Sequence, residues 1–155
     1  MFKQVLLAFS TFILISIQIT SYAAAPAGMI SKASKYSVTE TINKLEAVLK
    51  KKGITVVTRW SHSDKAKNVG IDLRPTELIL FGNPKLGSHL FTSHQTAGID
   101  LPLKALAWQD ENGKVWLSYN DPAYIAQRHH IADRKKIIAK MTNALNKLTN
   151  VATGH

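Results

Sequence analysis

Apolar residues recur at helical spacing in two stretches of the chain. The first stretch, at 37–53, opens with Ser37 and Glu40 placed as a capping box, in which the serine hydroxyl accepts from the glutamate amide. It ends at Gly53, a residue type that commonly terminates helices. The second stretch begins near Asp133, which is expected to cap it, and its apolar stripe comprises Ile137, Ile138, Met141, Leu145 and Leu148.

Four stretches between these two helices have the composition of β-strands. The β-branched run at 54–60 predicts one strand, and the continuous apolar run within 75–82 predicts another that is buried on both faces. Two further strands, at 103–108 and 115–119, flank an Asn-Gly pair at 112–113. Both turn residues are expected to take positive φ, so these strands are predicted to form an antiparallel hairpin.

Weaker signals complete the order of elements. They predict a short strand near 29–35 and short helices near 63–68, at 85–95 and from 122 towards 130. Strands grouped between helices, with at least one hairpin, indicate an α+β fold of two layers, in which helices cover one face of an antiparallel sheet. Residues 36–150 are expected to form a single domain after an N-terminal lead at 24–35.

The first 23 residues differ in kind from the rest. Lys3 supplies a positive start, residues 5–19 are almost wholly apolar, and 21–23 form a small-x-small pattern that ends at Ala23. These are the three parts of a secretory signal peptide, so we expect cleavage near Ala23 and a periplasmic or secreted protein without stable membrane insertion. An uncleaved membrane anchor is the alternative, although the apolar run is short for a full span.

Composition excludes some kinds of chemistry. The chain has 155 residues and no cysteine, which excludes thiol redox reactions, thiolate metal sites and a lipoprotein anchor. Its formal net charge is +10, and part of it follows Asp133, where one arginine and four lysines occur without an acid. Such a basic surface could favour nucleic acid or anionic lipid, but export argues against nucleic acid. We interpret it as a solvated helix face or a contact with the anionic cell envelope.

Several phrases in the second half of the chain occur in a distinctive order. LRPTELILFGNP at 73–84 is followed by GIDLPLK at 98–104, by Trp108, by WLSYNDP at 116–122 and by Arg-His at 128–129. This stretch resembles the bacterial family called domain of unknown function 302 (DUF302), and the resemblance extends from about Tyr36 to Ile131. It implies a compact TBP-like fold with a curved antiparallel sheet in the order β-α-β4-α. It implies no established activity and a tendency to form homodimers.

The polar turns that end two predicted strands are the candidate ligand site. Asn83 precedes one proline, and Asn120 with Asp121 precedes another. Both turns could share one end of the sheet with His62 and Tyr119, and these five residues would then form a polar mouth. The alternative is turn chemistry, in which Asn and Asp side chains bond to their own backbone.

Aromatic residues on the predicted strands suggest a second feature of the interior. Trp60, Trp108 and Trp116 are expected either in the core or in the lining of an aromatic pocket. A curved sheet packed against helices can also enclose an apolar cavity, which is a normal place for a small ligand.

Histidines make a metal or haem site worth testing, since imidazole is a common metal ligand. A metal- or haem-associated redox or accessory enzyme would use His62 with His94 or His129. No pair has the spacing of a zinc-binding helix, so no metal ligand is assigned. The run Ser-His-Ser-Asp at 61–64 holds residue types of hydrolases, yet chain neighbours rarely face each other and no Gly-x-Ser-x-Gly elbow is present.

These patterns together predict an exported domain that is not an enzyme and that binds a small ligand or a protein partner. No catalytic residue and no cofactor are assigned. The metal- or haem-associated enzyme and a structural homodimer remain the alternatives.

Overall fold

The computed structural model describes residues 26–155, so the predicted signal peptide at 1–23 lies outside the described residues. Strands and helices alternate irregularly along this part of the chain. In order they are β1 (Met29–Ala33), α1 (Val38–Lys51), β2 (Thr55–Ser61), α2 (His62–Lys67), β3 (Thr76–Gly82), α3 (Pro84–Ser93), the 3-10 helix η1 (Gln95–Ile99), β4 (Leu103–Gln109), β5 (Val115–Asn120), α4 (Pro122–Arg128) and α5 (Lys135–Thr153).

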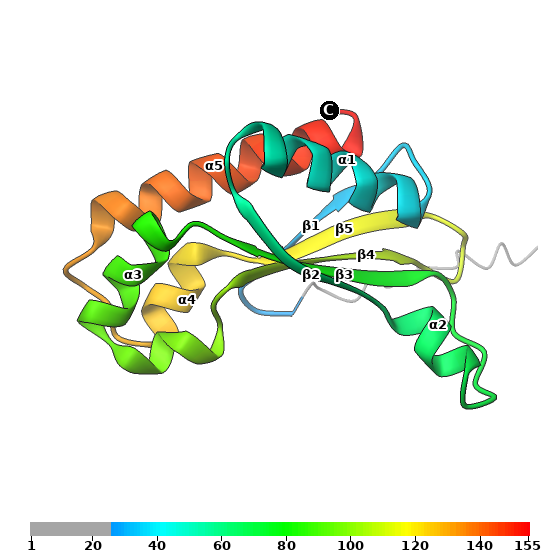
Figure 1. Cartoon of the computed structure of the whole chain (residues 1–155), viewed down its shortest axis with the longest axis horizontal. Coiled ribbons are helices and arrows are strands. Elements are labelled where there is room, and N and C mark those ends of the chain that lie inside the picture. The colour runs from blue at the N-terminus through cyan, green and yellow to red at the C-terminus, as the bar shows by residue number, and fades with distance from the viewer. Residues whose placement is uncertain (1–25) are drawn as a thin grey trace, which may run out of the picture.

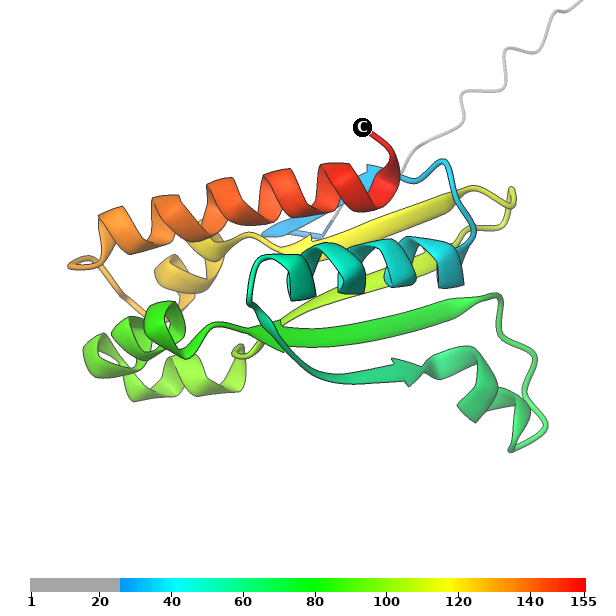
Figure 2. The ribbon, with the colours of Figure 1, turned by 45° about the horizontal axis from the view of Figure 1, so that its top comes forward.

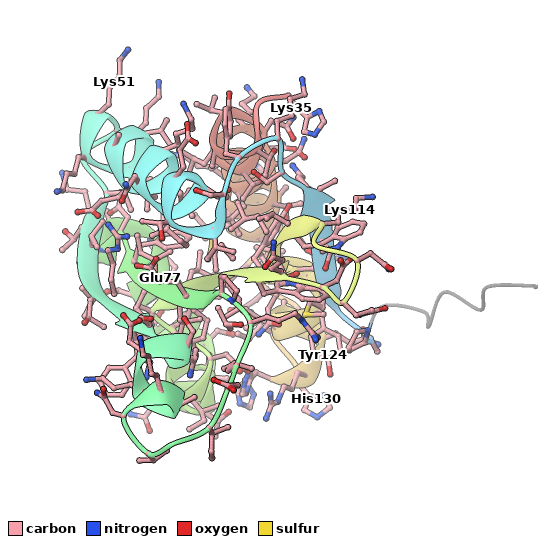
Figure 3. The ribbon with its side chains drawn as sticks, turned by 90° about the vertical axis from the view of Figure 1, so that its right-hand side faces the viewer. Lys35, Lys51, Glu77, Lys114, Tyr124 and His130 are labelled. Atoms are coloured by element: carbon pink, nitrogen blue, oxygen red, sulfur yellow. The ribbon has the colours of Figure 1, made fainter. Side chains whose placement is uncertain are left out.

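All the strands join one antiparallel sheet in the order β1-β5-β4-β3-β2. Helices α1 and α5 lie side by side across one face of this sheet (Figures 1 and 2). Figure 3 shows Lys51, at the end of α1, on the helix-covered side, and Tyr124 and His130 on the opposite side. The predicted α+β architecture, an antiparallel sheet with helices packed on it, is therefore confirmed.

The main core lies between the sheet and these two helices. Alternate residues of β3 and β5, namely Ile79, Phe81, Leu117 and Tyr119, are at most 4% exposed. They pack against the buried residues of both helices: Val38, Ile42, Leu45, Leu49, Leu145, Leu148 and Ala152. Burying one large apolar side chain contributes roughly 1.5–3 kcal/mol, so this interface is the principal source of apolar stabilisation.

The helix-start signals in the sequence differ in how well they predict the structure. Ser37 caps α1 as predicted, and its hydroxyl accepts from the Glu40 amide at 3.2 Å. The prediction that Asp133 caps α5 is wrong, because Arg134 is the N-cap residue and no side chain bonds there. Asp133 instead accepts from the Ser93 hydroxyl and pairs with Arg134. The Asp133 carboxylate thus bonds to Ser93 of α3 instead of capping the start of α5, as the local pattern predicted.

The hairpin between β4 and β5 forms as predicted, but its turn is of a different kind. Gly113 has a φ of 78°, whereas Asn112 does not take positive φ. The Asp110 carboxylate accepts from the backbone amides of Asn112 and Lys114. The loop is longer than a two-residue turn, so a single left-handed residue is enough to reverse the chain.

The other face of the sheet has no helix across its middle in the described part of the chain. Leu78 and Leu80 point to this face, away from Ile79 and Phe81, and both are only half-buried. The prediction that this strand is buried on both faces is therefore wrong. Helices α3 and α4 flank one end of the sheet, and α2 extends from the other end (Figure 1).

Three tryptophans lie on this uncovered surface instead of in the core. Trp60 is 48% exposed, and the rings of Trp108 and Trp116 stack with their centroids 6.4 Å apart. We call this surface the open face, and its large apolar members on β2 to β5 are Trp60, Leu78, Leu80, Leu106, Trp108 and Trp116. The expectation of tryptophans in the core is therefore wrong, because strand periodicity separates the two faces of a sheet without telling which one is covered.

Candidate functional site

The candidate site is an apolar pocket at the end of the sheet where β3 passes into α3. Its volume is about 60 Å³, and it lies where the main core meets a smaller apolar cluster around Leu90, Leu101 and Met141. The lining comprises Ile54, Phe81, Gly82, Asn83, Leu86, Gly87, Leu101, Leu103, Met141, Ala144, Leu145 and Leu148. Walls of carbon atoms offer no hydrogen-bond partner, so a buried charge or polar group would be unfavourable there and an apolar ligand group suits the space.

Small residues on two helices leave this space open. Ala144 occupies a position in the apolar stripe of α5 between Met141 and Leu148. Gly87 lies within α3, and a Cβ added to it would meet no atom within 4 Å. Glycine inside a helix lowers stability by roughly 0.5–1 kcal/mol relative to alanine. This wall of the pocket is therefore left open by a residue that does not favour the helix. These two residues are the sequence signal that could have indicated the pocket, although only the fold shows that they line one space.

Asn83 carries the only polar side chain in this lining. It is the N-cap of α3, where its side-chain oxygen accepts from the Lys85 amide at 3.0 Å and Pro84 occupies the first turn. Of the five residues predicted to bind a ligand, Asn83 alone lines the pocket.

The other four predicted ligand residues lie apart from the pocket lining. Asn120 is the last residue of β5 and Asp121 follows it, at the same end of the sheet as Asn83, and Asp121 caps α4. Tyr119 points into the main core, where burial raises its pKa. His62 begins α2 at the far end of the sheet (Figure 1). The structure therefore does not bring His62 and Tyr119 into a mouth with the two polar turns.

The histidines of the proposed metal or haem site are dispersed in the same way. His62 follows Ser61, the last residue of β2, which pairs with Glu77 near the start of β3. His94 ends α3 and His129 ends α4, both at the opposite end of the sheet (Figure 1). A site that combines His62 with either of them is therefore not assembled. Within residues 26–155, no three histidine or acidic side chains form a cluster that could hold a metal ion.

The Ser-His-Ser-Asp run at 61–64 bonds to the backbone around it. The Ser61 hydroxyl accepts from the Asp64 amide at 3.1 Å and so caps α2. The Ser63 hydroxyl accepts from the Thr76 amide. Helix capping and loop closure thus account for the hydroxyl groups that resembled a hydrolase sequence.

Sequence reasoning missed a buried polar cluster beside the pocket end of the sheet. His129 Nε2 lies 2.7 Å from Asp100 Oδ2, and His129 Nδ1 lies 3.0 Å from Thr96 Oγ1. The Asp100 carboxylate oxygen accepts from the His129 Nε2–H, and Nδ1 and the Thr96 hydroxyl share the second hydrogen bond. Arg128 adds a longer contact of 3.3 Å to Asp100. The cluster ties the end of α4 to η1, and no local pattern signals contacts between such distant residues.

Comparison with known proteins identifies the family. The family described as Domain of unknown function DUF302 matches residues 30–148. The chain belongs to the DUF302 family. The DUF302 match confirms the resemblance noted in the sequence, and it contains every residue that lines the pocket.

A solved DUF302 structure has the same fold. It is the crystal structure of an uncharacterized conserved DUF302 protein from Bacillus stearothermophilus, and it superposes with a TM-score of 0.74. The alignment covers 82% of this chain and 99% of that chain at 22% sequence identity. At this level of identity the likeness shows the fold alone.

Curated relatives from Brucella contain a segment similar to this DUF302 chain. The Fluoride-specific ion channel FluC 1 of Brucella suis is 44% identical over 128 residues, which cover 82% of this chain and 50% of the relative. FluC 2 of Brucella melitensis is equally similar, with 47% of its length covered. The chain thus spans about half the length of the curated relatives it matches. Among residues 26–155, no helix is both long enough and apolar enough to cross a membrane.

Proposed function

We propose that this DUF302 protein is an exported binding domain, not an enzyme, and that it holds a small, largely apolar ligand in the pocket between β3, α3 and α5. The pocket itself is the observation that carries the proposal. It offers about 60 Å³ of space bounded by carbon atoms, with one polar side chain in its lining. Filling this space would supply the dispersion contacts that the wall atoms lack on their open side.

The chemistry of the lining supports binding in preference to catalysis. The wall residues include no acid, base or hydroxyl group. General acid–base and nucleophilic catalysis both need such a group within hydrogen-bond reach of the substrate. Polar residues nearby, such as Asn83 and Asp121, are helix caps.

The N-terminal sequence supports export to the periplasm or beyond. Its positive start, apolar stretch and small residues have the order of a secretory signal peptide. Cleavage near Ala23 would leave the fold intact, because β1 begins at Met29.

Native mass spectrometry of the protein purified from the periplasm of an expressing bacterium tests export and binding together. The expected mass is that of a chain beginning at Ala24 plus the excess of a small bound molecule. Replacing Ala144 with phenylalanine places a ring in the pocket, so this variant is expected to lose the excess mass. The same substitution is expected to weaken binding of the neutral probe xenon, an apolar atom small enough for about 60 Å³ of space, at least tenfold as measured by xenon NMR.

Two further variants separate loss of the pocket from loss of the fold. Met141→Ala enlarges the pocket and is expected to retain the probe, whereas Ala132→Phe changes an exposed residue outside the lining and leaves binding unchanged. The proposal fails if folded Ala144→Phe protein binds the probe as tightly as the parent protein does. It also fails if the parent protein binds neither the probe nor any co-purifying molecule.

The name of the Brucella relatives raises fluoride as a possible ligand. Fluoride is a small, strongly hydrated anion, and the pocket lining offers it at most the amide of Asn83. Moving an anion from water to carbon walls is strongly unfavourable without compensating partners. We therefore propose that fluoride is not the ligand of this pocket, and sodium fluoride serves as a negative control that leaves probe binding unchanged.

The open face supports a homodimer as a second candidate function. Trp60, Leu78 and Leu106 lie opposite one another across three adjacent strands. Lys104 is the only charged residue of the strands that points to this face.

The ammonium groups of Lys65 and Lys114 also lie over the rings of Trp60 and Trp116. Packing the aromatic and aliphatic side chains against the same face of a second copy would remove apolar area from water. We therefore propose that a second copy of the chain covers this face.

Sedimentation velocity across the micromolar range checks the dimer directly. The parent protein is expected to sediment increasingly as a dimer as its concentration rises. Leu106→Glu introduces a charge into the centre of the apolar patch and is expected to weaken the dimer at least tenfold. Val151→Glu is the matched control, because Val151 is exposed on α5 and lies off the open face. A parent protein that stays monomeric at the highest concentration would remove this candidate.

A further inference from the structure

A groove rich in lysine runs beside the pocket. It lies between the end of α1 and the stretch of α5 from Lys136 to Leu148, and its volume is about 670 Å³. Figure 2 shows these two helices side by side. The lining comprises Lys52, Ile54, Lys136, Ala139, Lys140, Asn143, Ala144, Lys147 and Leu148. The lining combines four lysines with one asparagine and with small and apolar side chains, and it contains no acidic residue.

The four lysines of this groove have no acidic partner in the described part of the chain. Every ion pair there involves other cations, and α5 contains no acidic residue. Lys136 and Lys140 lie four residues apart, where like charges on a helix repel each other. Lys136 also lies in the first turn of α5, where the helix dipole disfavours cations. Positive charge retained against such local preferences is typical of a functional surface.

The groove and the apolar pocket share a wall. Ile54, Ala144 and Leu148 line both spaces, so a molecule that extends out of the pocket past Ala144 would enter the groove. Lysine stems are aliphatic and can lie along an alkyl chain while their charged ends stay in water. The two spaces therefore offer carbon walls at one end and cations at the other.

We propose that the protein binds a single-chain anionic amphiphile of the alkyl carboxylate class, an inference that rests on the binding role proposed for the pocket. The pocket takes the tip of the alkyl chain. The remainder of the chain passes Ala144 into the groove, and the carboxylate lies against Lys140 and Lys147. This arrangement gives each part of the ligand a matching surface, because the apolar pocket alone has no partner for a charge.

Isothermal titration of the purified protein with octanoate and with octanol, both below the concentration at which octanoate forms micelles, tests the inference. The two ligands share an alkyl chain and differ in charge. Octanoate is expected to bind about tenfold more tightly than octanol at low ionic strength. The difference is expected to shrink as salt is added, because the groove is open to solvent and its charges are screened.

Substitutions in the groove assign the charge preference to named residues. The double variant Lys140→Gln/Lys147→Gln is expected to bind octanoate and octanol equally while its octanol affinity stays unchanged. The matched control, Lys67→Gln/Lys114→Gln, removes the same charge away from the groove and is expected to keep the tenfold preference. Ala144→Phe is expected to weaken both ligands, since it blocks the shared wall.

The outcomes distinguish this inference from the function on which it rests. Equal binding of octanoate and octanol to the parent protein overturns the charged amphiphile but leaves the pocket standing, whereas no binding of either overturns the pocket itself. Inorganic phosphate that binds as tightly as octanoate shows that the lysines hold a free anion. Phosphatidylglycerol vesicles that bind the parent and Ala144→Phe proteins equally, together with unselective octanoate binding, show a membrane contact. Either result overturns the inference.

Discussion

Replacing Asp100 with alanine is expected to lower the free energy of unfolding by about 3 kcal/mol. Asp100 and His129 are 8% and 6% exposed, and their side chains bond at 2.7 Å. Without the carboxylate, the buried Nε2–H of His129 has no acceptor, and a buried group that loses its partner pays the full loss of hydration. Urea unfolding followed by tryptophan fluorescence measures the change.

A carboxylate on the surface supplies the control for this substitution. Asp133 bonds to Ser93 and Arg134 but is 54% exposed, so Asp133→Ala is expected to change stability by less than about 1 kcal/mol. Replacing both members of the buried pair, as Asp100→Leu/His129→Phe, is expected to recover part of the loss, because the groups that then lack a partner, on Thr96 and Arg128, belong to exposed residues that water can hydrate. Equal effects of Asp100→Ala and Asp133→Ala would show that the pair does not stabilise the fold.

Replacing Phe81 with alanine is expected to lower the free energy of unfolding by about 3–5 kcal/mol. Phe81 is 2% exposed and belongs to the main core between β3 and the covering helices. Its ring also forms part of the pocket wall, so its removal leaves a cavity that joins an existing one and cannot easily collapse. Urea unfolding measures the loss, and the enlarged pocket is expected to retain the neutral probe at low denaturant.

Leu80 is the matched control for Phe81, because it is the preceding residue on the same strand. It points to the open face and is only half-buried, so Leu80→Ala is expected to lower the stability of the monomer by about 1 kcal/mol or less. Equal losses for the two variants at low protein concentration would contradict a sheet that is covered on one face only. A larger loss for Leu80→Ala at high concentration would instead report the homodimer.

Signals confined to a few neighbouring residues predicted the structure well. The predicted Ser37 cap forms with the Glu40 amide, and Asp121 accepts from the nearby Ala123 amide, which is the turn chemistry given as the alternative to a ligand role. The apolar stripe of α5 is buried at Met141, Leu145 and Leu148. Caps and stripes depend on spacing along one helix, so the sequence contains all the information that they need.

Predictions that depended on contacts between distant parts of the chain were less accurate. Asp133 was expected at a helix start but bonds to Ser93 of α3. The Asp100–His129 pair joins residues 29 positions apart, and no periodicity announces such a contact. The residues expected to form one polar mouth do not meet. Because β2 pairs with β3 in antiparallel orientation, His62 lies at the opposite end of the sheet from Asn83.

The pocket and the groove show the same division between local and tertiary information. Ala144 and Gly87 are visible in the sequence as small residues within helices, and the lysines after Asp133 are visible as a basic run. Their meeting in one place is not visible, because it requires α5 to cross both the end of α1 and the start of α3.

The sequence by itself determined the elements, their order, the α+β class and the family, because each follows from residue spacing, turn chemistry or a shared motif. Only the tertiary structure decided which face of the sheet α1 and α5 cover, and hence that Phe81 is core while Leu80 and Trp60 are surface. An alternating strand pattern distinguishes two faces, but the choice between them depends on where the connecting chain places the helices.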